Sequence, residues 1–326
     1  MRKIRVCILS VAHVHTPTYV RCLRHNPGAE IVGFYDEDAE RAQAFVQEQG
    51  VKRFCDARKL LEEEKPDVAL VCAQNMRHAR WVEMAADAGV DVLCEKPLGV
   101  GGMDAQDMID HCRRRGVRLM TAMCNRYIHA YREAANAVRE GRIGRLVAVF
   151  ASNKGTMPGG WFVQREESGG GCIIDHTVHV ADLMNCLVGA LPEEVWALEG
   201  HNLFSMDVED CAVINMRYPG GVLVTLDASW SRTRHFPYGR DLTLRLVGTK
   251  GNIYVDYFSP HNEVYAPGER IYSYYAEDKD QMMIDDLIQC YQEDRPFGIT
   301  GEDGRDCALV AEAAYRSLKA KAPVRL

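Results

Sequence analysis

The sequence predicts an α/β protein in which a doubly wound parallel sheet is followed by an α+β region with a mostly antiparallel sheet. Over the first third of the chain, short apolar runs alternate with amphipathic segments, as in parallel strands joined by crossover helices. After about residue 123 the alternation stops and several strands follow one another, which favours antiparallel pairing. A chain of 326 residues has room for about two such domains.

In the first region, each apolar run is short enough for a strand and each amphipathic segment long enough for a helix. The apolar runs predict strands at residues 4–9, 31–35, 68–73, 90–94 and 118–122. The amphipathic segments predict helices at residues 16–24, 39–49, 59–64, 78–88 and 104–115. Strands that are buried on both faces read as continuous apolar runs, so this sheet should be covered by helices on both sides.

In the second region, helices frame a run of strands. Strands are expected at residues 146–151, 194–199, 211–218, 222–230, 241–247 and 252–256. The sequence Tyr218-Pro219-Gly220-Gly221 between two of them is a hairpin signal. Helices are expected at residues 130–140, from the triple glycine 169–171 to 187, at 281–292 and at 303–320. We therefore expect two domains, 1–122 and 123–326, with the final helices able to pack back on the first.

Composition excludes several classes of protein. Hydrophobic residues make up 47% and charged residues 26%, which excludes a disordered chain, a collagen and a coiled coil. No apolar run approaches the ~20 residues of a membrane span, so no membrane partner is expected. The net charge is −7 without a basic stripe, so no nucleic-acid partner is expected. Arg5 interrupts the first apolar run, which we interpret as a strand rather than a signal peptide. The twelve cysteines form no CxxC pair, which favours reduced thiols in the cytoplasm.

The first strand is followed by a turn in which a dinucleotide fold would carry GxGxxG. Here the three glycine positions hold Ser10, Ala12 and His15. Serine and alanine are small, and a helix that begins near Val14 still offers free N–H groups and a positive dipole end to a phosphate. His13 and His15 could add donors or, when protonated, positive charge; the alternative is that both are ordinary turn and helix-start residues.

An acidic stretch ends the second strand. Asp36 lies at the distance from the turn that suits an adenosine ribose with free hydroxyls. A carboxylate there repels a 2′-phosphate, so NAD is favoured over NADP. The alternative is that Asp36 or Asp38 caps the following helix.

The tripeptide Glu95-Lys96-Pro97 follows a parallel strand, at the sheet edge where α/β proteins bind ligands. A lysine there can hydrogen-bond a substrate oxygen and stabilise developing charge, and the Lys96–Pro97 bond could be cis. The alternative is a solvated lysine in a surface loop. Asn75 and His78 follow the neighbouring strand and could face a nicotinamide, or could simply start a helix.

The helix after the triple glycine carries a second polar cluster. Asp175, His179 and Asp182 are spaced i, i+4 and i+7 and share one helical face, which His176 borders. Burial and a neighbouring carboxylate tune a histidine for general acid–base chemistry. One alternative is a structural cluster that caps the helix. A second is a metal held by His176, His179, Asp175 and perhaps His13, but neither HExxH nor a zinc spacing is present, so no metal is expected.

Three further residues suit a sugar pocket. Arg126, Tyr127 and Trp161 supply a guanidinium and aromatic faces, which bind polyhydroxylated ligands. Tyrosine and tryptophan are also ordinary core residues, which is the alternative.

Together these residues resemble the glucose–fructose oxidoreductase / inositol dehydrogenase / MocA (Gfo/Idh/MocA) oxidoreductases along nearly the whole chain. The resemblance is carried, in order, by Asn75, His78, Glu95-Lys96-Pro97, Asn125-Arg126-Tyr127, Trp161, the triple glycine with Asp175, His179 and Asp182, then Asp210, Gly248-Thr249-Lys250-Gly251 and Gly301-Glu302-Asp303.

The resemblance implies an N-terminal Rossmann domain, which binds NAD(P), and a C-terminal domain with a large open sheet that often forms a dimer or tetramer interface. It also implies oxidation or reduction of a hydroxyl of a sugar, inositol or related ring. The family's lysine matches Lys96, and its aspartate and histidine match Asp175 and His179. This chain departs from the family in its first turn, and again at His176 and Thr177, where an apolar residue and a glycine are common.

The prediction from the sequence is an NAD-dependent oxidoreductase acting on a carbohydrate or cyclitol, as a homodimer or homotetramer. His179 would accept the hydroxyl proton, Lys96 would polarise the oxygen, and Asp175 would orient His179 or bind a neighbouring hydroxyl. Ser10, Ala12, His13, Asp36, Asn75, His78, Glu95 and Lys96 would bind the cofactor, and Arg126, Tyr127, Trp161 and His176 the substrate. Two alternatives stay open: an enzyme that retains NAD and eliminates or hydrolyses a neighbouring bond, and a non-catalytic sugar sensor.

Overall fold

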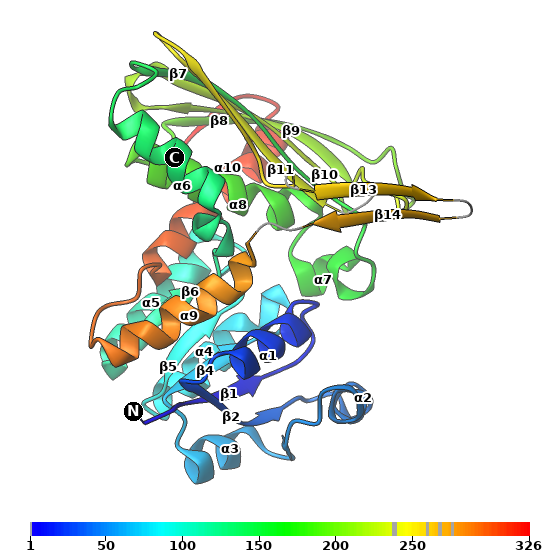
Figure 1. Ribbon diagram of the computed structural model, residues 1–326, viewed down its shortest axis with the longest axis vertical. Helices are drawn as coiled ribbons and strands as arrows, with labels where there is room; N and C mark the ends of the chain where they lie inside the picture. The colour runs from blue at the N-terminus through cyan, green and yellow to red at the C-terminus, as the bar shows by residue number, and fades with distance from the viewer. Residues whose placement is uncertain (1, 237–239, 259–260, 267–268, 275–276) are drawn as a thin grey trace. The chain divides into compact units, whose positions relative to one another are not determined.

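The computed structural model describes residues 2–236, 240–258, 261–266, 269–274 and 277–326 (Figure 1). The chain divides into two compact units, each built from several stretches of sequence. The first unit comprises residues 1–124, 166–169 and 279–308, and the second comprises 125–165, 170–278 and 309–326. In the described part of the chain, no helix is both long and apolar enough to cross a membrane.

The first unit contains a parallel sheet of six strands in the order β3-β2-β1-β4-β5-β6, which confirms the doubly wound prediction. The strands are β1 (Ile4–Leu9), β2 (Ala29–Tyr35), β3 (Arg53–Phe54), β4 (Val68–Val71), β5 (Asp91–Cys94) and β6 (Leu119–Thr121). The strand order reverses between β1 and β4. Ligands of open α/β sheets bind outside the carboxyl ends of the strands at such a point.

Helices cover this sheet, and two of them begin at an aspartate cap. They are α1 (Thr16–His25), α2 (Ala39–Gln49), α3 (Ala57–Glu64), α4 (His78–Asp87), α5 (Gly102–Arg115) and α9 (Lys279–Gln292). Asp38 and Asp56 cap α2 and α3 by accepting backbone N–H groups of the first turn. One buried cluster joins apolar strand residues such as Leu9 and Val71 to α3, α4 and α5. α9 packs against α1, where the Gln281 amide donates to the Cys22 carbonyl at 3.1 Å.

The second unit contains a seven-stranded sheet in the order β12-β11-β7-β10-β9-β8-β15. The strands are β7 (Leu146–Gly155), β8 (Glu194–Gly200), β9 (Cys211–Tyr218), β10 (Val222–Ser229), β11 (Arg240–Gly248), β12 (Asn252–Asp256) and β15 (Val324–Arg325). β7 and β10 run parallel, and the other neighbouring strands of this sheet run antiparallel. This confirms the mostly antiparallel prediction, and the expected hairpin after Tyr218 joins β9 to β10.

Helices of the second unit lie along its sheet. They are α6 (His129–Arg139), α8 (Cys172–Val188) and the part of α10 (Gly301–Ala320) from residue 309 onward. The unit also contains Arg165, the first residue of the short α7 (Arg165–Ser168). α8 packs against β7, β9 and β10, as Figure 1 shows in green. Tyr131 of α6 donates its hydroxyl to the Leu183 carbonyl of α8 at 2.7 Å, which ties the two helices together.

The sequence patterns missed four strands and misplaced several boundaries. β3 and β15 have two residues each, too few to show a period. The hairpin of β13 (His261–Ala266) and β14 (Glu269–Tyr274) is rich in polar residues and shows no apolar run. β7 continues to Gly155, beyond the predicted end at 151, because its polar residues Ser152, Asn153 and Lys154 are paired with strands on both sides.

Candidate active site

The turn between β1 and α1 keeps a glycine-like backbone although its glycines are replaced. Ser10 has φ +63°, in the left-handed region that glycine normally occupies. Its hydroxyl donates to Asp36 at 3.1 Å and its N–H donates to the Tyr35 carbonyl at 2.8 Å, so hydrogen bonds offset the strained backbone. α1 then begins at Thr16, and no side chain caps it at His15. The His15 N–H donates to Nδ1 of His13 at 3.3 Å and the Thr16 N–H donates to the His13 carbonyl at 3.1 Å, so the turn itself holds the start of α1.

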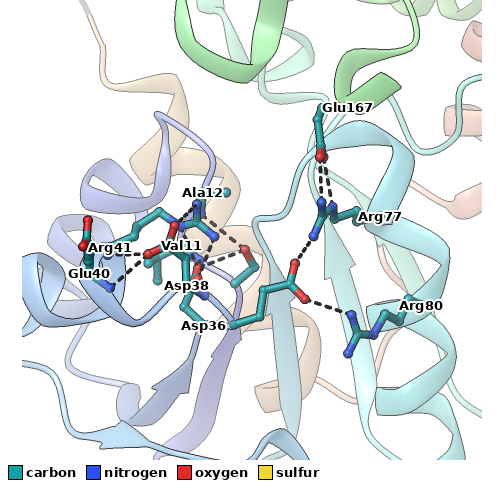
Figure 2. A network of polar contacts seen from close by, with 11 residues as sticks. Val11, Ala12, Asp36, Asp38, Glu40, Arg41, Arg77, Arg80 and Glu167 are labelled. Atoms are coloured by element: carbon teal, nitrogen blue, oxygen red, sulfur yellow. Dashed lines mark hydrogen bonds and ion pairs between the residues drawn. The ribbon is translucent and has the colours of Figure 1, made fainter. Parts of the chain in front are cut away.

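Asp36 is buried at the end of β2 and receives five donors. Its Oδ2 accepts from the Ser10 hydroxyl, the Val11 N–H at 2.7 Å and the Arg41 Nε at 3.0 Å. Its Oδ1 accepts from the Asp38 N–H at 2.8 Å and the Arg41 Nη2 at 2.7 Å. Figure 2 shows Asp36 beside the turn and Arg41. Asp38, rather than Asp36, is the cap of α2. The Asp36 carboxylate thus lies at the carboxyl end of β2, and two of its donors come from Arg41, a side chain that is only partly buried.

A second ionic network lies beside this one. Arg77 donates to both oxygens of Glu167, at 2.6 and 2.9 Å, and pairs with Glu37, which also accepts from Arg80 at 2.9 Å. Figure 2 shows the Arg77 guanidinium pointing toward Glu167. This network could not be predicted from the sequence, because Glu167 is 90 residues from Arg77.

Two amide oxygens are buried without a partner in the described part of the chain, at the carboxyl end of β4. They are Oε1 of Gln74 and Oδ1 of Asn75. The Asn75 amide nitrogen donates to the Ser168 carbonyl at 2.9 Å, which fixes that side chain. Buried polar atoms are normally satisfied, so these oxygens indicate the place of a hydrogen-bonding ligand.

His78 has a different place from the one we expected. Its Nδ1 lies 2.9 Å from the Pro97 carbonyl and its Nε2 lies 3.2 Å from the Ala73 carbonyl. Burial is the main cause that lowers the pKa of this imidazole. Both ring nitrogens therefore lie next to backbone carbonyls, and His78 connects the segment after β4 with the loop after β5.

Glu95 is the centre of a buried cluster after β5. Its Oε1 accepts from the Tyr19 hydroxyl at 2.5 Å and lies 3.0 Å from Nδ1 of His15 and 3.3 Å from Nδ1 of His13. Its Oε2 accepts from the Lys96 N–H at 2.9 Å. Burial opposes the charge, but His13, His15 and Lys96 outweigh it and hold the pKa of Glu95 well below its usual range. Lys96 is buried beside it, and the Lys96–Pro97 bond is cis.

This cluster also has the spacing of a metal site, since His13, His15 and Glu95 offer ligand atoms within 4.8 Å of one another. The carboxylate, however, already accepts hydrogen bonds at both oxygens, so the geometry is explained without an ion. In the described part of the chain, His176 and His179 do not form a second group of this kind.

The first unit therefore has the features that an NAD site needs. The turn keeps its left-handed residue, a carboxylate ends β2 and two amide oxygens after β4 lack partners in the described part of the chain. The residues present fit the cofactor, and Ser10, Ala12, Asp36 and Asn75 would hold it. The departure from the glycine fingerprint changes side chains without removing the turn.

The triple glycine that precedes α8 is required by close packing. A Cβ on Gly170 would lie 1.9 Å from the Tyr315 hydroxyl, and one on Gly171 would lie 2.1 Å from the Glu209 carbonyl oxygen. Glu209, buried and 38 residues from Gly171, supplies the cap that the glycines cannot. Its Oε1 accepts from the N–H groups of Gly171 at 2.9 Å and Ile173 at 3.1 Å, and from the Tyr315 hydroxyl at 2.7 Å. Spacing along the sequence gave no signal for this cap.

α8 presents Asp175, His176 and His179 in its first two turns. The Asp175 Oδ2 accepts from the Trp230 indole at 3.1 Å and lies 3.3 Å from Nε2 of His176. His176 is nearly buried, and its Nδ1 has no hydrogen-bond partner in the described ranges. His179 is half-buried. Asp175 thus contacts both Trp230 and His176, and Trp230 is a contact that the sequence did not indicate.

The residues expected to line a sugar pocket are partly engaged by the protein itself. Arg126 forms an ion pair with buried Asp182, with Nη2 to Oδ1 at 2.6 Å. Tyr127 is buried, and its ring faces the Arg132 guanidinium at 4.8 Å. Trp161 stacks on Phe162 with ring centroids 3.8 Å apart. Asp182 therefore orients Arg126.

Comparisons with known proteins agree with this geometry. The oxidoreductase family with an NAD-binding Rossmann fold matches residues 5–123, and the GFO/IDH/MocA C-terminal domain matches residues 131–254. Myo-inositol 2-dehydrogenase of Thermotoga maritima is 26% identical over 99% of this chain and 98% of its own length. A 2,7-anhydro-N-acetylneuraminate hydratase of Mediterraneibacter gnavus is 29% identical over 72% of this chain and 63% of its own. The structure of GenD2 from gentamicin A biosynthesis, solved with NAD, has a TM-score of 0.91 at 20% identity, covering 100% of this chain and 97% of that one.

Proposed function

Because the chain belongs to the GFO/IDH/MocA family of NAD-binding oxidoreductases, we propose that it transfers hydride between nicotinamide and a secondary hydroxyl of a sugar, inositol or related polyol. The observation that carries the proposal is the pair of Asp175 and His179 on the first turns of α8, in a chain that keeps Lys96 after β5. The similarity to a myo-inositol 2-dehydrogenase, which covers 98% of that protein's length, supports the substrate class.

Bound NAD would supply the acceptor for the hydride that leaves the hydroxyl-bearing carbon. The chain's own groups handle the proton and the oxygen. The imidazole of His179 accepts the hydroxyl proton, and the Lys96 ammonium hydrogen-bonds the oxygen as its charge develops. Asp175 orients His179 or binds a neighbouring hydroxyl, and the Trp230 indole and His176 hold Asp175 in place. Arg126, Tyr127, Trp161 and His176 would line the substrate site.

The test is a screen of polyols and sugars with NAD, followed by variants on the best substrate. His179→Ala is expected to lower kcat by about 10²–10⁴-fold with NAD affinity unchanged. Lys96→Met should lower kcat by a similar order. His201, an exposed residue of the same unit, provides the control variant His201→Ala, which should behave as wild type. A His179→Ala enzyme with unchanged kcat would remove that residue from the mechanism.

We also propose that the chain prefers NAD to NADP. Asp36 is an anion at the end of β2, and a 2′-phosphate would be repelled by it. Calorimetric titration of both cofactors tests this preference, and Asp36→Ser should narrow the difference in affinity. Comparable affinities of the wild-type protein for the two cofactors would contradict the assignment.

A second candidate reaction is favoured by one comparison. The relative from Mediterraneibacter gnavus is named a hydratase and not a dehydrogenase. A member that retains NAD could oxidise one sugar position transiently and eliminate or hydrolyse a neighbouring bond. Native mass spectrometry of the purified protein separates the two, because a cofactor that survives purification supports the recycling reaction. If neither NAD nor NADP produces heat in calorimetry, a non-catalytic sugar sensor becomes the better description.

We further propose that a second copy of the chain covers one face of the seven-stranded sheet. One row across that sheet contains the exposed aromatic residues Tyr254, Phe150 and Trp196, aligned by the strand register. Exposed apolar patches of this kind mark protein interfaces. Light scattering should give a dimer or tetramer, and Phe150→Glu should dissociate it.

We propose that the protein works in the cytoplasm, because its twelve cysteines are free thiols.

A further inference from the structure

Asp36 is a buried carboxylate whose acceptor sites are all taken in the free protein. Its side chain has no exposed surface, and its two oxygens accept five N–H or O–H groups. A carboxylate offers about four such sites. A ribose that donates its hydroxyls to Asp36 must therefore replace donors that the chain itself supplies.

The donors to Asp36 differ in how easily they can leave. Three belong to the turn after β1 and to the end of β2: the hydroxyl of buried Ser10 and the backbone N–H groups of Val11 and Asp38. A backbone donor cannot move away unless its segment changes conformation. The other two are Nε and Nη2 of Arg41, on a flexible side chain that is 30% exposed. Arg41 is thus the donor that a ligand can displace without rearranging the backbone.

Arg41 binds Asp36 in the way that a ribose diol would. Its Nη2 donates to Oδ1 at 2.7 Å and its Nε donates to Oδ2 at 3.0 Å, so two adjacent donors reach the two oxygens (Figure 2). The 2′ and 3′ hydroxyls of a ribose are also two adjacent donors. Asp38 offers the displaced guanidinium a second anion, because its Oδ2 lies 3.6 Å from Nη1 of Arg41 and nearly half of its side chain is exposed.

We propose that Arg41 occupies the ribose position on Asp36 in the free protein, and that NAD binds by replacing this guanidinium with its two ribose hydroxyls. Arg41 then turns toward Asp38 and solvent. The exchange selects between cofactors, because a ribose phosphorylated at its 2′ position has a single hydroxyl left and cannot replace both donors. Arg41 is therefore a specificity-determining residue, which holds the affinity for NAD below the value that Asp36 alone would give. This inference rests on the coenzyme site of the proposed function.

Calorimetric titration of NAD into Arg41→Met tests the exchange. If charge alone mattered, removing a positive charge would weaken the binding of an anionic dinucleotide, whereas the exchange predicts that the affinity for NAD rises. We expect a rise of about tenfold, because breaking a hydrogen bond to a charged group costs about that factor in an equilibrium constant. The affinity for NADP should not rise. Arg41→Lys keeps the charge but not the paired donors, so it should also bind NAD more tightly if the methionine variant does not fold.

A double-mutant cycle locates the effect at this one contact. In an Asp36→Asn background, where the carboxylate that holds the guanidinium is gone, Arg41→Met should no longer raise the affinity for NAD. Arg80→Met is the matched control, since Arg80 pairs with Glu37 at 2.9 Å rather than with Asp36, and it should not raise the affinity either.

The possible outcomes separate this inference from the coenzyme site. An affinity for NAD that stays the same or falls in Arg41→Met would overturn the inference while leaving the coenzyme site intact. An equal rise for NADP, or an equal rise in the Asp36→Asn background, would overturn the exchange of donors on Asp36 in the same way. If neither the wild-type protein nor Arg41→Met binds NAD, the coenzyme site is overturned as well.

Discussion

Replacing Glu209 tests whether a distant carboxylate holds the helix that carries Asp175 and His179. The Glu209 side chain is fully buried and accepts two N–H groups from the start of α8, and its backbone carbonyl accepts a third, from Cys172 at 3.0 Å. Glu209→Gln keeps an acceptor oxygen but removes a negative charge from the helix N-terminus. An anion at a helix N-terminus is worth up to about 2 kcal/mol.

Glu209→Ala should cost more than Glu209→Gln. It leaves two backbone N–H groups and the Tyr315 hydroxyl without their acceptor, and each buried unsatisfied donor costs about 1–3 kcal/mol. We therefore expect a loss of about 4 kcal/mol in the free energy of unfolding of the second unit. Since Tyr315→Phe removes one of the three donors, its effect should not be additive with that of Glu209→Gln.

Hydrogen exchange followed by mass spectrometry is the suitable assay, because it reports on α8 by itself. Peptides from residues 172–188 should exchange faster by about 30-fold in Glu209→Gln, which corresponds to ~2 kcal/mol. Glu199→Gln, which alters an exposed carboxylate of the same unit, is the control and should change stability by less than about 0.5 kcal/mol. Unchanged exchange in α8 for both Glu209 variants would refute the capping role.

Three further predictions follow from contacts described above. His13 stays neutral in the folded protein because burial lowers its pKa to about 3, whereas in the unfolded chain its pKa is ~6.5. The free energy of unfolding should therefore fall by about 1.4 kcal/mol between pH 7.5 and 5.5 because of this group. Urea unfolding of His13→Asn should show a smaller fall over the same pH range. Arg77→Gln breaks part-exposed ion pairs with Glu37 and Glu167, so it should lower the free energy of unfolding by at most about 1 kcal/mol. Because salt screens such pairs, an equal loss of stability in 1 M salt would contradict this explanation. Gly170→Ala should lower the melting temperature sharply, since its Cβ would meet the Tyr315 hydroxyl at 1.9 Å, and adding Tyr315→Phe should recover part of the loss.

The parts of the fold that could be predicted are those in which the signal is local. Each strand and helix of the first sheet except β3 shows its own apolar period, and Asp38 and Asp56 cap helices within their own sequence. The ends of β7 could not be predicted because its last residues are polar and are held by neighbouring strands rather than by burial.

In the candidate site, too, some features could be predicted from local sequence and others could not. The place of Asp36 after β2 and of Lys96 after β5 follows from strand ends, which the sequence shows. The contacts that hold the site do not follow, because they join residues far apart along the chain. Tyr19 bonds Glu95 across 76 positions, and Trp230 bonds Asp175 across 55. Only the folded chain brings such pairs together.

The discontinuous make-up of the first unit has a consequence for biosynthesis. α9 packs on α1 through Gln281 and Cys22. In the sequence, however, most of the second unit lies between residues 1–124 and α9. A ribosome that adds roughly 5–20 residues per second needs about 8–34 s between residue 124 and the end of α9 at Gln292. During that interval the part of α1 that packs against α9 has no covering helix. The nascent chain is thus exposed to aggregation for that period, and chaperones that bind apolar helices would find their target there.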